Sequence, residues 1–187
     1  PDSIKITKWF DTSELFKSRL DMLMWNAITG LVLVFFGLLI FLSPALAGWV
    51  SAGIAISFLG CFALLPYTGV ALSMISLFAF LLILGIVVDD AIIIGESVHR
   101  ENQNGNLGDQ GAIDGATKVA RPVIFSAITT MIFFSPMLMI EGIIGQFVLG
   151  IPVVVILCLT FSILESLFIL PSHLRHLSDK KSNDFAR

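Results

Sequence analysis

Apolar residues gather in five runs, each long enough to cross a bilayer, and polar residues or prolines separate the runs. The runs cover approximately residues 23–42, 48–65, 72–98, 122–140 and 147–170. A helix needs about 20 predominantly apolar residues to span the hydrocarbon core of a membrane. The pattern therefore predicts an all-α membrane protein, a polytopic bundle of five transmembrane helices.

The segments outside the runs complete this predicted organisation. Residues 1–22 are mixed and polar, with apolar residues at helical spacing toward the first run, and they predict an amphipathic, extracytoplasmic lead-in. Asp11, with Glu14 three residues later, resembles a helix start. Residues 99–121 predict a solvent loop with a weakly helical second half, and residues 171–187 predict a polar tail.

Four prolines predict where the spans begin, end or bend. Pro44 and Pro171 each follow an apolar run, and we expect each to end its helix because proline donates no backbone hydrogen bond. Pro122 fits the first turn of the fourth span, and Pro136 should kink that span near its far end. Residues 141–146 then predict a short turn.

Composition supports the membrane interpretation and excludes an ordinary soluble domain. The sequence is 56% hydrophobic and 13% charged, whereas soluble domains carry about 25% charged residues. The 11 Lys and Arg residues form no basic block, so nucleic acid is not an expected partner. Membrane lipid is the partner that this composition predicts.

The distribution of basic residues predicts the orientation of the chain. Most of the 11 Lys and Arg residues lie in the 99–121 segment and the C-terminal tail. By the positive-inside rule these segments face the cytoplasm. The chain begins at Pro1 rather than Met and shows no signal-peptide pattern, so we interpret it as a segment of a longer polypeptide.

Two adjacent carboxylates, Asp89 and Asp90, lie in the middle of the third apolar run. An ionisable side chain at the centre of a membrane helix costs about 2.5 to 3.5 kcal/mol on insertion scales, and movement of ions or protons is the usual reason for one. Two like charges this close cannot both ionise easily without a cation. No Lys or Arg lies in the five runs. The pair therefore predicts a proton relay that is partly protonated or takes its counter-ion from outside this segment; the alternative is a pair that only holds helices together by hydrogen bonds.

Small residues around the pair predict close helix packing. Gly85 lies one turn before Asp89, and Ala91 and Gly95 form a small-xxx-small pair. Such residues let neighbouring helix backbones approach one another in membranes. Close packing would allow two side chains that point about 100° apart to share one polar surrounding.

Other polar side chains in the spans extend the list of candidates. Glu96 lies two turns after the first aspartate, and Glu165 lies in the fifth span; each is either an accessory proton path or a carboxylate with only a structural role. The fourth span carries a polar stripe, formed by Ser126, Thr129 and Thr130. Interhelical hydrogen bonding is the favoured interpretation of this stripe over a relay.

Enzymatic chemistry is not expected from these residues. An intramembrane aspartyl protease needs aspartates that face each other from different helices, whereas here the pair is consecutive and no other span contains an Asp. No glycine-rich phosphate loop and no His or Cys cluster with metal-ligand spacing occurs, so neither a metal nor another cofactor is predicted. Cys61 and Cys158 lie in apolar runs and are expected to pack as small hydrophobic residues.

Two stretches resemble a known family. Residues 85–100 (GIVVDDAIIIGESVHR) are similar to the fourth transmembrane helix of resistance-nodulation-division (RND) efflux transporters, and residues 165–174 (ESLFILPSHL) are similar to the end of their sixth. The resemblance implies helices two to six of the amino-terminal half of a pseudo-symmetric membrane domain. It also implies that Asp89 and Asp90 bind the transported protons, with a lysine from the second half of the same polypeptide as counter-ion.

The resemblance further implies a setting and a substrate class. The aspartate doublet favours the branch that exports drugs or amphiphiles by proton antiport across the bacterial inner membrane. By the same resemblance the partners are two further copies in a homotrimer, a periplasmic adaptor and an outer-membrane channel. The alternatives are a relative that exports metal, lipid or protein, and a non-transporting scaffold or sensor of related fold.

Overall fold

The computed structural model describes residues 12–41, 43–106 and 108–173, and these residues are helical apart from short connections. The fold is the predicted polytopic helical bundle. The elements, in chain order, are α1 (Thr12–Phe41), α2 (Pro44–Leu64) with the 3-10 turn Leu65–Thr68, α3 (Met74–Gln103), α4 (Gly108–Phe134) with the 3-10 turn Ser135–Met139, α5 (Gly142–Val148), and α6 (Gly150–Leu164) with the π-helical turn Glu165–Ile169.

Four helical stretches of the described chain are long and apolar enough to cross a membrane. They are Pro44–Thr68, Met74–Gln103, Gly108–Met139 and Gly142–His173. The first predicted span corresponds to α1, whose apolar part, Ile28–Ile40, is shorter. The expected lead-in does run into this span, because α1 is one continuous helix from Thr12; Asp11 lies outside the described residues.

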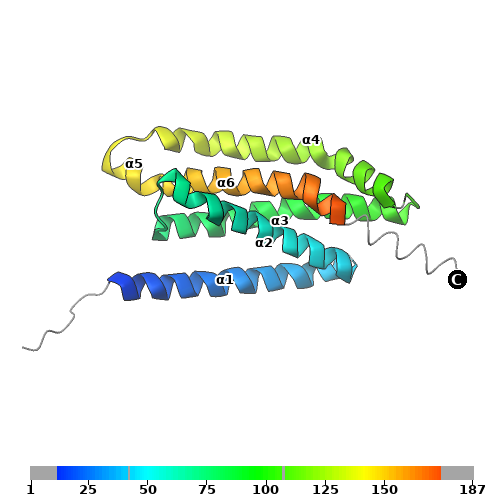
Figure 1. The fold of residues 1–187 in the computed structure, drawn as a ribbon, viewed down its shortest axis with the longest axis horizontal. Helices are drawn as coiled ribbons and strands as arrows, with labels where there is room; N and C mark the ends of the chain where they lie inside the picture. Colours follow the sequence, from blue (N-terminus) through cyan, green and yellow to red (C-terminus); the bar gives the residue numbers. More distant parts are fainter. Residues whose placement is uncertain (1–11, 42, 107, 174–187) are drawn as a thin grey trace, which may run out of the picture.

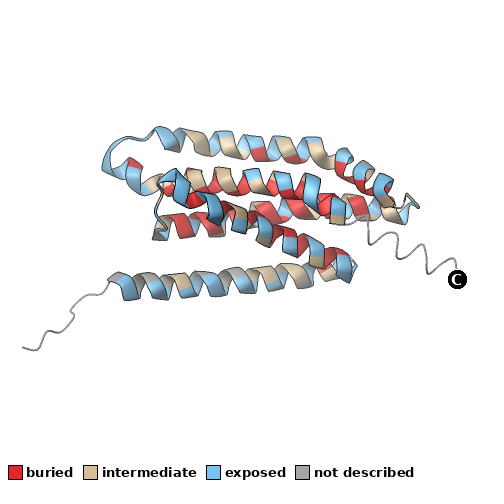
Figure 2. Ribbon diagram, viewed as in Figure 1, coloured by how far each residue is buried: buried red, intermediate tan, exposed pale blue. Residues whose placement is uncertain are grey.

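Helices α3 and α6 form the centre of the bundle and run in the same direction (Figure 1). Helix α4 packs along one side of both, α2 along another, and α1 contacts α2 and α3 at the edge. The buried residues therefore follow the facing sides of the central helices (Figure 2), and they include Ile83, Val87, Ile94, Val154 and Leu159. Because lipid is itself apolar, tight van der Waals packing rather than escape from water holds such a bundle together.

Residues 99–121 are more helical than predicted. Helix α3 continues to Gln103, where a loop was expected, and the expected helical second half belongs to α4, which already begins at Gly108. The cause is tertiary contact: the Ser97 hydroxyl donates to the Gly115 carbonyl at 2.7 Å, and the Lys118 ammonium pairs with the Glu101 carboxylate. These contacts join two helix ends whose glycines and polar residues, taken alone, favour a loop.

The first span ends before Pro44 as predicted, and Pro44 opens α2. Two other proline predictions need correction. Pro122 lies inside α4 rather than in its first turn. The helix after α6 continues through Pro171 to His173. The π-helical turn just before it makes this possible, because its i→i−5 bond, from the Leu170 amide to the Glu165 carbonyl, loosens the helix where proline would otherwise break it.

Two further details concern the far end of α4. The α-helix ends at Phe134, and Pro136 lies in the first residues of the following 3-10 turn, which is where a bend was predicted. The predicted short turn at 141–146 is instead the start of helix α5. Gly142 precedes the rest of α5 with φ of 80°, a backbone conformation that glycine adopts without strain.

Candidate functional site

The helix that carries the aspartate pair is fixed at its start by a capping box. The Ser73 hydroxyl accepts a hydrogen bond from the Ser76 amide at 3.3 Å, and the Ser76 hydroxyl accepts one from the Ser73 amide at 2.7 Å. The backbone of Gly150, at the start of α6, lies against Ser76 so closely that a Cβ on Gly150 would stand 3.2 Å from the Ser76 Cβ. The capping box and this contact align α3 and α6 at one end of the bundle.

Asp89 and Asp90 are consecutive but occupy different surroundings. Asp90 is only 4% exposed, and its Oδ2 atom has no hydrogen-bond partner among the described residues. Asp89 is exposed on the outer side of α3. Within this chain the two carboxylates therefore do not share one pocket, because adjacent positions on a helix point about 100° apart and only one of them faces the bundle.

The small residues near the pair divide in the same way. Ala91 is 2% exposed and Gly95 is buried, so both lie on the inner side of α3. Gly85 is exposed, and a Cβ placed on it would meet nothing within 4 Å. The predicted close approach at Gly85 is thus not made by any described helix of this chain, since Gly85 lies on the outer side with Asp89.

The polar stripe on α4 does not bond to other helices in the described part of the chain. The Thr129 hydroxyl donates to the Phe125 carbonyl at 2.7 Å, and the Thr130 hydroxyl donates to the Ser126 carbonyl at 3.0 Å. Ser126 and Thr129 are exposed. Within the described residues each threonine hydroxyl thus bonds to the carbonyl four residues earlier in its own helix, and interhelical bonding of this stripe stays a prediction.

The two accessory carboxylates differ in their partners. Glu96 is exposed and accepts a hydrogen bond from Arg100 one turn later, with a distance of 2.9 Å between Oε1 and the guanidinium nitrogen. Glu165 is 3% exposed, and no described residue donates a hydrogen bond or an ion pair to its carboxylate. Of the two accessory candidates, only Glu165 is buried in the bundle.

Gly53 on α2 is the contact of Glu165 that sequence reasoning missed. The carboxylate of Glu165 lies directly against Gly53, and any Cβ at that position would overlap the carboxyl carbon and both oxygens. A glycine in an apolar helix is common in membrane proteins, so the sequence carries no signal that singles out Gly53.

The two cysteines lie between α2 and α6 as packed, unoxidised side chains. Both are 0% exposed and free, and the Cys61 thiol donates to the Val154 carbonyl at 3.9 Å. No group of three or more His, Cys, Asp or Glu side chains that could hold a metal ion occurs among the described residues. The titratable side chains of the spans are therefore the candidate functional groups.

Comparison with known proteins identifies the family. A family model described as the AcrB/AcrD/AcrF family matches residues 1–184. The chain belongs to the AcrB/AcrD/AcrF family. The resemblance to RND efflux transporters is thereby confirmed, and the AcrB/AcrD/AcrF proteins are transporters rather than a family of enzymes.

Individual members of the AcrB/AcrD/AcrF family resemble the chain along nearly all of its length. A toluene efflux pump membrane transporter (TtgE) of Pseudomonas putida is 27% identical over 98% of the chain, and a solvent-resistant pump membrane transporter (SrpB) of the same species is 27% identical over 92%. A multidrug resistance protein (MdtC) of Yersinia enterocolitica is 28% identical over 95%. The chain spans 17 to 18% of the length of these relatives.

Proposed function

We propose that this chain is the proton-coupling part of an RND efflux transporter of the bacterial inner membrane, in which Asp89 and Asp90 bind the protons that drive export. The observation that carries the proposal is Asp90, a carboxylate that is 4% exposed at membrane depth with an oxygen that no described residue bonds. A purely structural polar residue at that depth would be hydrogen-bonded. Asp90 instead has the unsatisfied character expected of a group that gains and loses a proton.

Proton coupling requires that the two protonation states favour different conformations of the protein. A protonated Asp90 is neutral and fits the apolar interior formed with Val87 and Ile94, whereas an ionised Asp90 needs a cation or water. A ligand shifts a conformational equilibrium only by its different affinity for the two states. Protonation of Asp90 therefore favours a conformation in which the helices close around the neutral carboxyl group. Loss of the proton favours a conformation in which the carboxylate reaches water or a cation.

Asp89, the exposed residue of the pair, supports a contact between α3 and a helix outside this chain. Asp89, Gly85 and Glu96 are all exposed on α3, at intervals of about one and two turns. An unpaired carboxylate facing lipid is costly. We therefore propose that a helix from the second half of the same polypeptide packs on this side and brings the lysine counter-ion implied by the family resemblance.

The proposed cargo and partners follow from the relatives. The similar proteins are named for efflux of toluene, for solvent resistance and for multidrug resistance, so we propose export of drugs or other amphiphiles by proton antiport. As in the family resemblance, the proposed assembly is a homotrimer that works with a periplasmic adaptor and an outer-membrane channel.

The test uses the complete transporter polypeptide in bacterial cells. Asp89→Asn and Asp90→Asn keep the side-chain volume but cannot exchange a proton, so each should abolish energised efflux of ethidium while the protein remains in the membrane at normal abundance. Asp21→Asn, the same change at an exposed carboxylate of α1, is the matched control and should export normally. Normal efflux by both aspartate variants would contradict the proposal and favour a scaffold or sensor role.

A further inference from the structure

The least expected side chain in the bundle is the Glu165 carboxylate. It is 3% exposed and belongs to the π-helical turn Glu165–Ile169 at the end of α6. A buried carboxylate ordinarily has a cation or several hydrogen-bond donors. Among the described residues Glu165 has neither.

Two serine hydroxyl groups near Glu165 in the chain or near Gly53 donate their hydrogen bonds elsewhere. The Ser166 hydroxyl, next in the chain, donates to the Ser162 carbonyl at 2.6 Å. The Ser57 hydroxyl on α2 donates to the Gly53 carbonyl at 3.1 Å. These serines satisfy themselves on backbone atoms and leave the Glu165 carboxylate unbonded, which argues against a purely structural hydrogen-bonding role.

The charged and titratable groups on the surrounding helices explain why no ion pair forms. The π-helical turn packs on α2, α3 and α6. Helix α2 contributes only Cys61 as a titratable side chain, and α6 contributes only Cys158. Helix α3 contributes Asp90 on its inner side, while the titratable groups nearer its end are Asp89, Glu96, His99, Arg100 and Glu101. The only basic groups among them, His99 and Arg100, lie at the helix end, where His99 contacts Gln103 and Arg100 pairs with Glu96.

Glu165 lies at about the same depth as Asp90. Ser76 and Gly150 touch at one end of the bundle, and α3 and α6 run in the same direction from there (Figure 1). Asp90 follows Ser76 by 14 residues and Glu165 follows Gly150 by 15. At 1.5 Å per residue, these positions are about 21 Å and about 22 Å from the shared contact. The two buried carboxylates therefore occupy one layer of the bundle on neighbouring helices.

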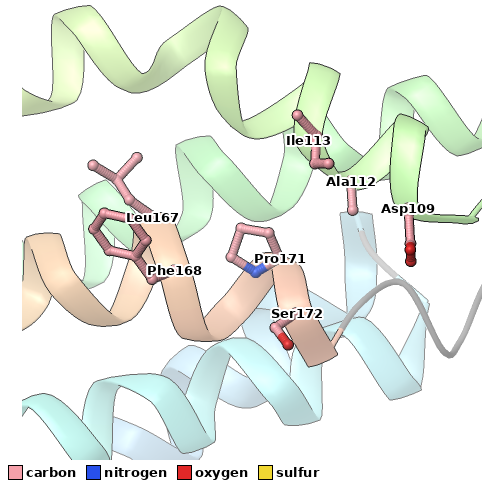
Figure 3. A pocket seen from close by; sticks show the side chains of 7 residues that line it. All are labelled: Asp109, Ala112, Ile113, Leu167, Phe168, Pro171 and Ser172. Carbon is pink, nitrogen blue, oxygen red and sulfur yellow. The ribbon is translucent and has the colours of Figure 1, made fainter.

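A cavity reaches the π-helical turn from the end of the bundle that the positive-inside rule places in the cytoplasm. Its volume is about 230 Å³, enough for several water molecules at about 30 Å³ each. Figure 3 shows its lining side chains, which are Asp109, Ala112 and Ile113 of α4 and Leu167, Phe168, Pro171 and Ser172 of the chain after Glu165. Leu167 and Phe168 belong to the same π-helical turn as Glu165, so the cavity reaches the backbone of that turn from the α4 side. The Glu165 carboxylate itself lies on the α2 side of the turn, against Gly53, and must move to meet water in the cavity.

We propose that Glu165 is a second proton-binding site of the transporter, which exchanges its proton with the cytoplasm through this cavity. In the exchange, the ionised carboxylate takes one proton from a hydronium ion and leaves a water molecule, and the reverse step releases the proton. Gly53 provides the space in which the carboxyl group is held, and the π-helical turn provides the backbone looseness that lets it move. The inference rests on the proposed proton-coupled function, which it extends from α3 to α6.

The first experiment detects the proton directly and needs no transported substrate. The complete transporter, with ¹³C-labelled glutamate carboxyl groups, is reconstituted in phospholipid vesicles, and infrared difference spectra are recorded across a pH series. A glutamic-acid band that appears and disappears with pH should be present in the unmodified protein and in Asp90→Asn. The expected result is loss of this band in both Glu165→Gln and Glu165→Asp, with an unlabelled aspartic-acid band that changes with pH appearing in Glu165→Asp only. An unchanged set of glutamate bands in Glu165→Gln would overturn the proposal.

Two glycine variants separate this role from packing. Gly53→Ala displaces the carboxylate, whereas Gly60→Ala disturbs the same α2–α6 interface by meeting the Phe161 ring, far from any carboxylate. Gly53→Ala should shift the pH at which the glutamate band changes, and Gly60→Ala should leave that pH unchanged. If both variants shifted the pH of the band change equally, general loosening of the α2–α6 interface would be the cause. That result would overturn the role assigned to the contact between Gly53 and the Glu165 carboxylate.

The rate of proton exchange at Glu165 tests whether protons reach it through the cavity. Ile113→Trp places a bulky ring in the lining, while Ile128→Trp places the same ring on an exposed position of α4 that is not in the lining. After a pH jump, the glutamate band should change more slowly in Ile113→Trp than in Ile128→Trp. Equal rates would overturn the cavity as the path.

The outcomes distinguish this proposal from the one on which it rests. If Asp90→Asn lost ethidium efflux but Glu165→Gln left the glutamate spectrum unchanged, the proposal for Glu165 would be rejected. The aspartate pair would remain the proposed coupling site. Normal efflux in both aspartate variants would remove the proposed function itself, whatever the spectrum of Glu165→Gln shows.

Discussion

Asp90 is buried in the bundle while Asp89, the residue before it, points about 100° away and is exposed on the outer side of α3. Two carboxylates of identical chemistry are thus divided between the interior of this chain and its outer surface. Asp90 is surrounded by residues of this chain, whereas any residues that surround Asp89 must come from outside it. The two positions are therefore expected to respond differently to the same substitution.

The first prediction compares Asp90→Asn with Asp89→Asn in residues 1–187 purified in detergent. Asp90→Asn replaces a buried carboxylate that lacks a partner by a neutral amide that can also donate hydrogen bonds, and it should stabilise the fold by about 1 to 3 kcal/mol. Asp89→Asn should change stability little because Asp89 is exposed. Thermal unfolding followed by circular dichroism measures both. Equal effects of the two variants would contradict the division into an inner and an outer carboxylate.

The second prediction concerns Gly85→Leu. In residues 1–187 alone the variant should unfold at the parental temperature, because a Cβ at Gly85 meets nothing within 4 Å. In the complete transporter it should weaken ethidium efflux, since Gly85 lies one turn from Asp89 on the side where we propose that another helix packs. Gly48→Leu is the control, because Gly48 also has open space around it but lies on α2. Parental efflux by Gly85→Leu at equal abundance would show that no helix packs closely there.

The third prediction concerns the crossing of α3 and α4. A Cβ on Gly115 would stand 2.6 Å from the Val98 Cα, which is backbone and cannot move aside cheaply. Gly115→Ala should therefore destabilise the chain by about 1 to 3 kcal/mol through overpacking. Gly48→Ala, in open space, is the control and should not destabilise it. The measurement is again thermal unfolding in detergent, and equal unfolding temperatures for the two variants would refute the close crossing.

The fourth prediction concerns the contact between the start of α2 and the end of the helix that continues from α6. The rings of Trp49 and His173 are stacked, with centroids 4.1 Å apart and planes 8° apart. A double-mutant cycle of Trp49→Leu and His173→Leu should give a coupling energy of about 0.5 to 1.5 kcal/mol, as for other aromatic pairs. Strictly additive effects would mean that the stacking contributes nothing beyond the separate burial of each ring.

Much of this architecture could be predicted from local pattern. Long apolar runs specify membrane helices because the hydrocarbon core accepts few other structures, and this holds whatever the neighbours are. The doublet Asp89–Asp90 stands out for the same reason, since the cost of a carboxylate at membrane depth does not depend on knowing its contacts. The family resemblance rested on residues 85–100, which contain this doublet, and on residues 165–174, and it was confirmed by the match over residues 1–184.

Local pattern misled where a contact between helices decided the outcome. Residues 99–121 look like a loop because of their glycines and polar side chains, yet Gly115 is what lets α4 approach Val98, and Lys118 reaches Glu101 from there. Pro171 looks like a helix end, yet the π-helical turn before it carries the helix onward. In each case a residue that disfavours helix locally is tolerated because the packed arrangement makes use of it.

The sequence by itself determined that the chain is a helical membrane bundle with an acidic pair at membrane depth, because apolar length and the cost of buried charge are properties of single segments. Only the tertiary structure decided which side of each helix faces inward. That choice buried Asp90 and exposed Asp89, left Gly85 open, and placed the Glu165 carboxylate against Gly53. The physical reason is that a helix with apolar residues all round can turn almost any side toward its neighbours, and the close contacts with those neighbours select one.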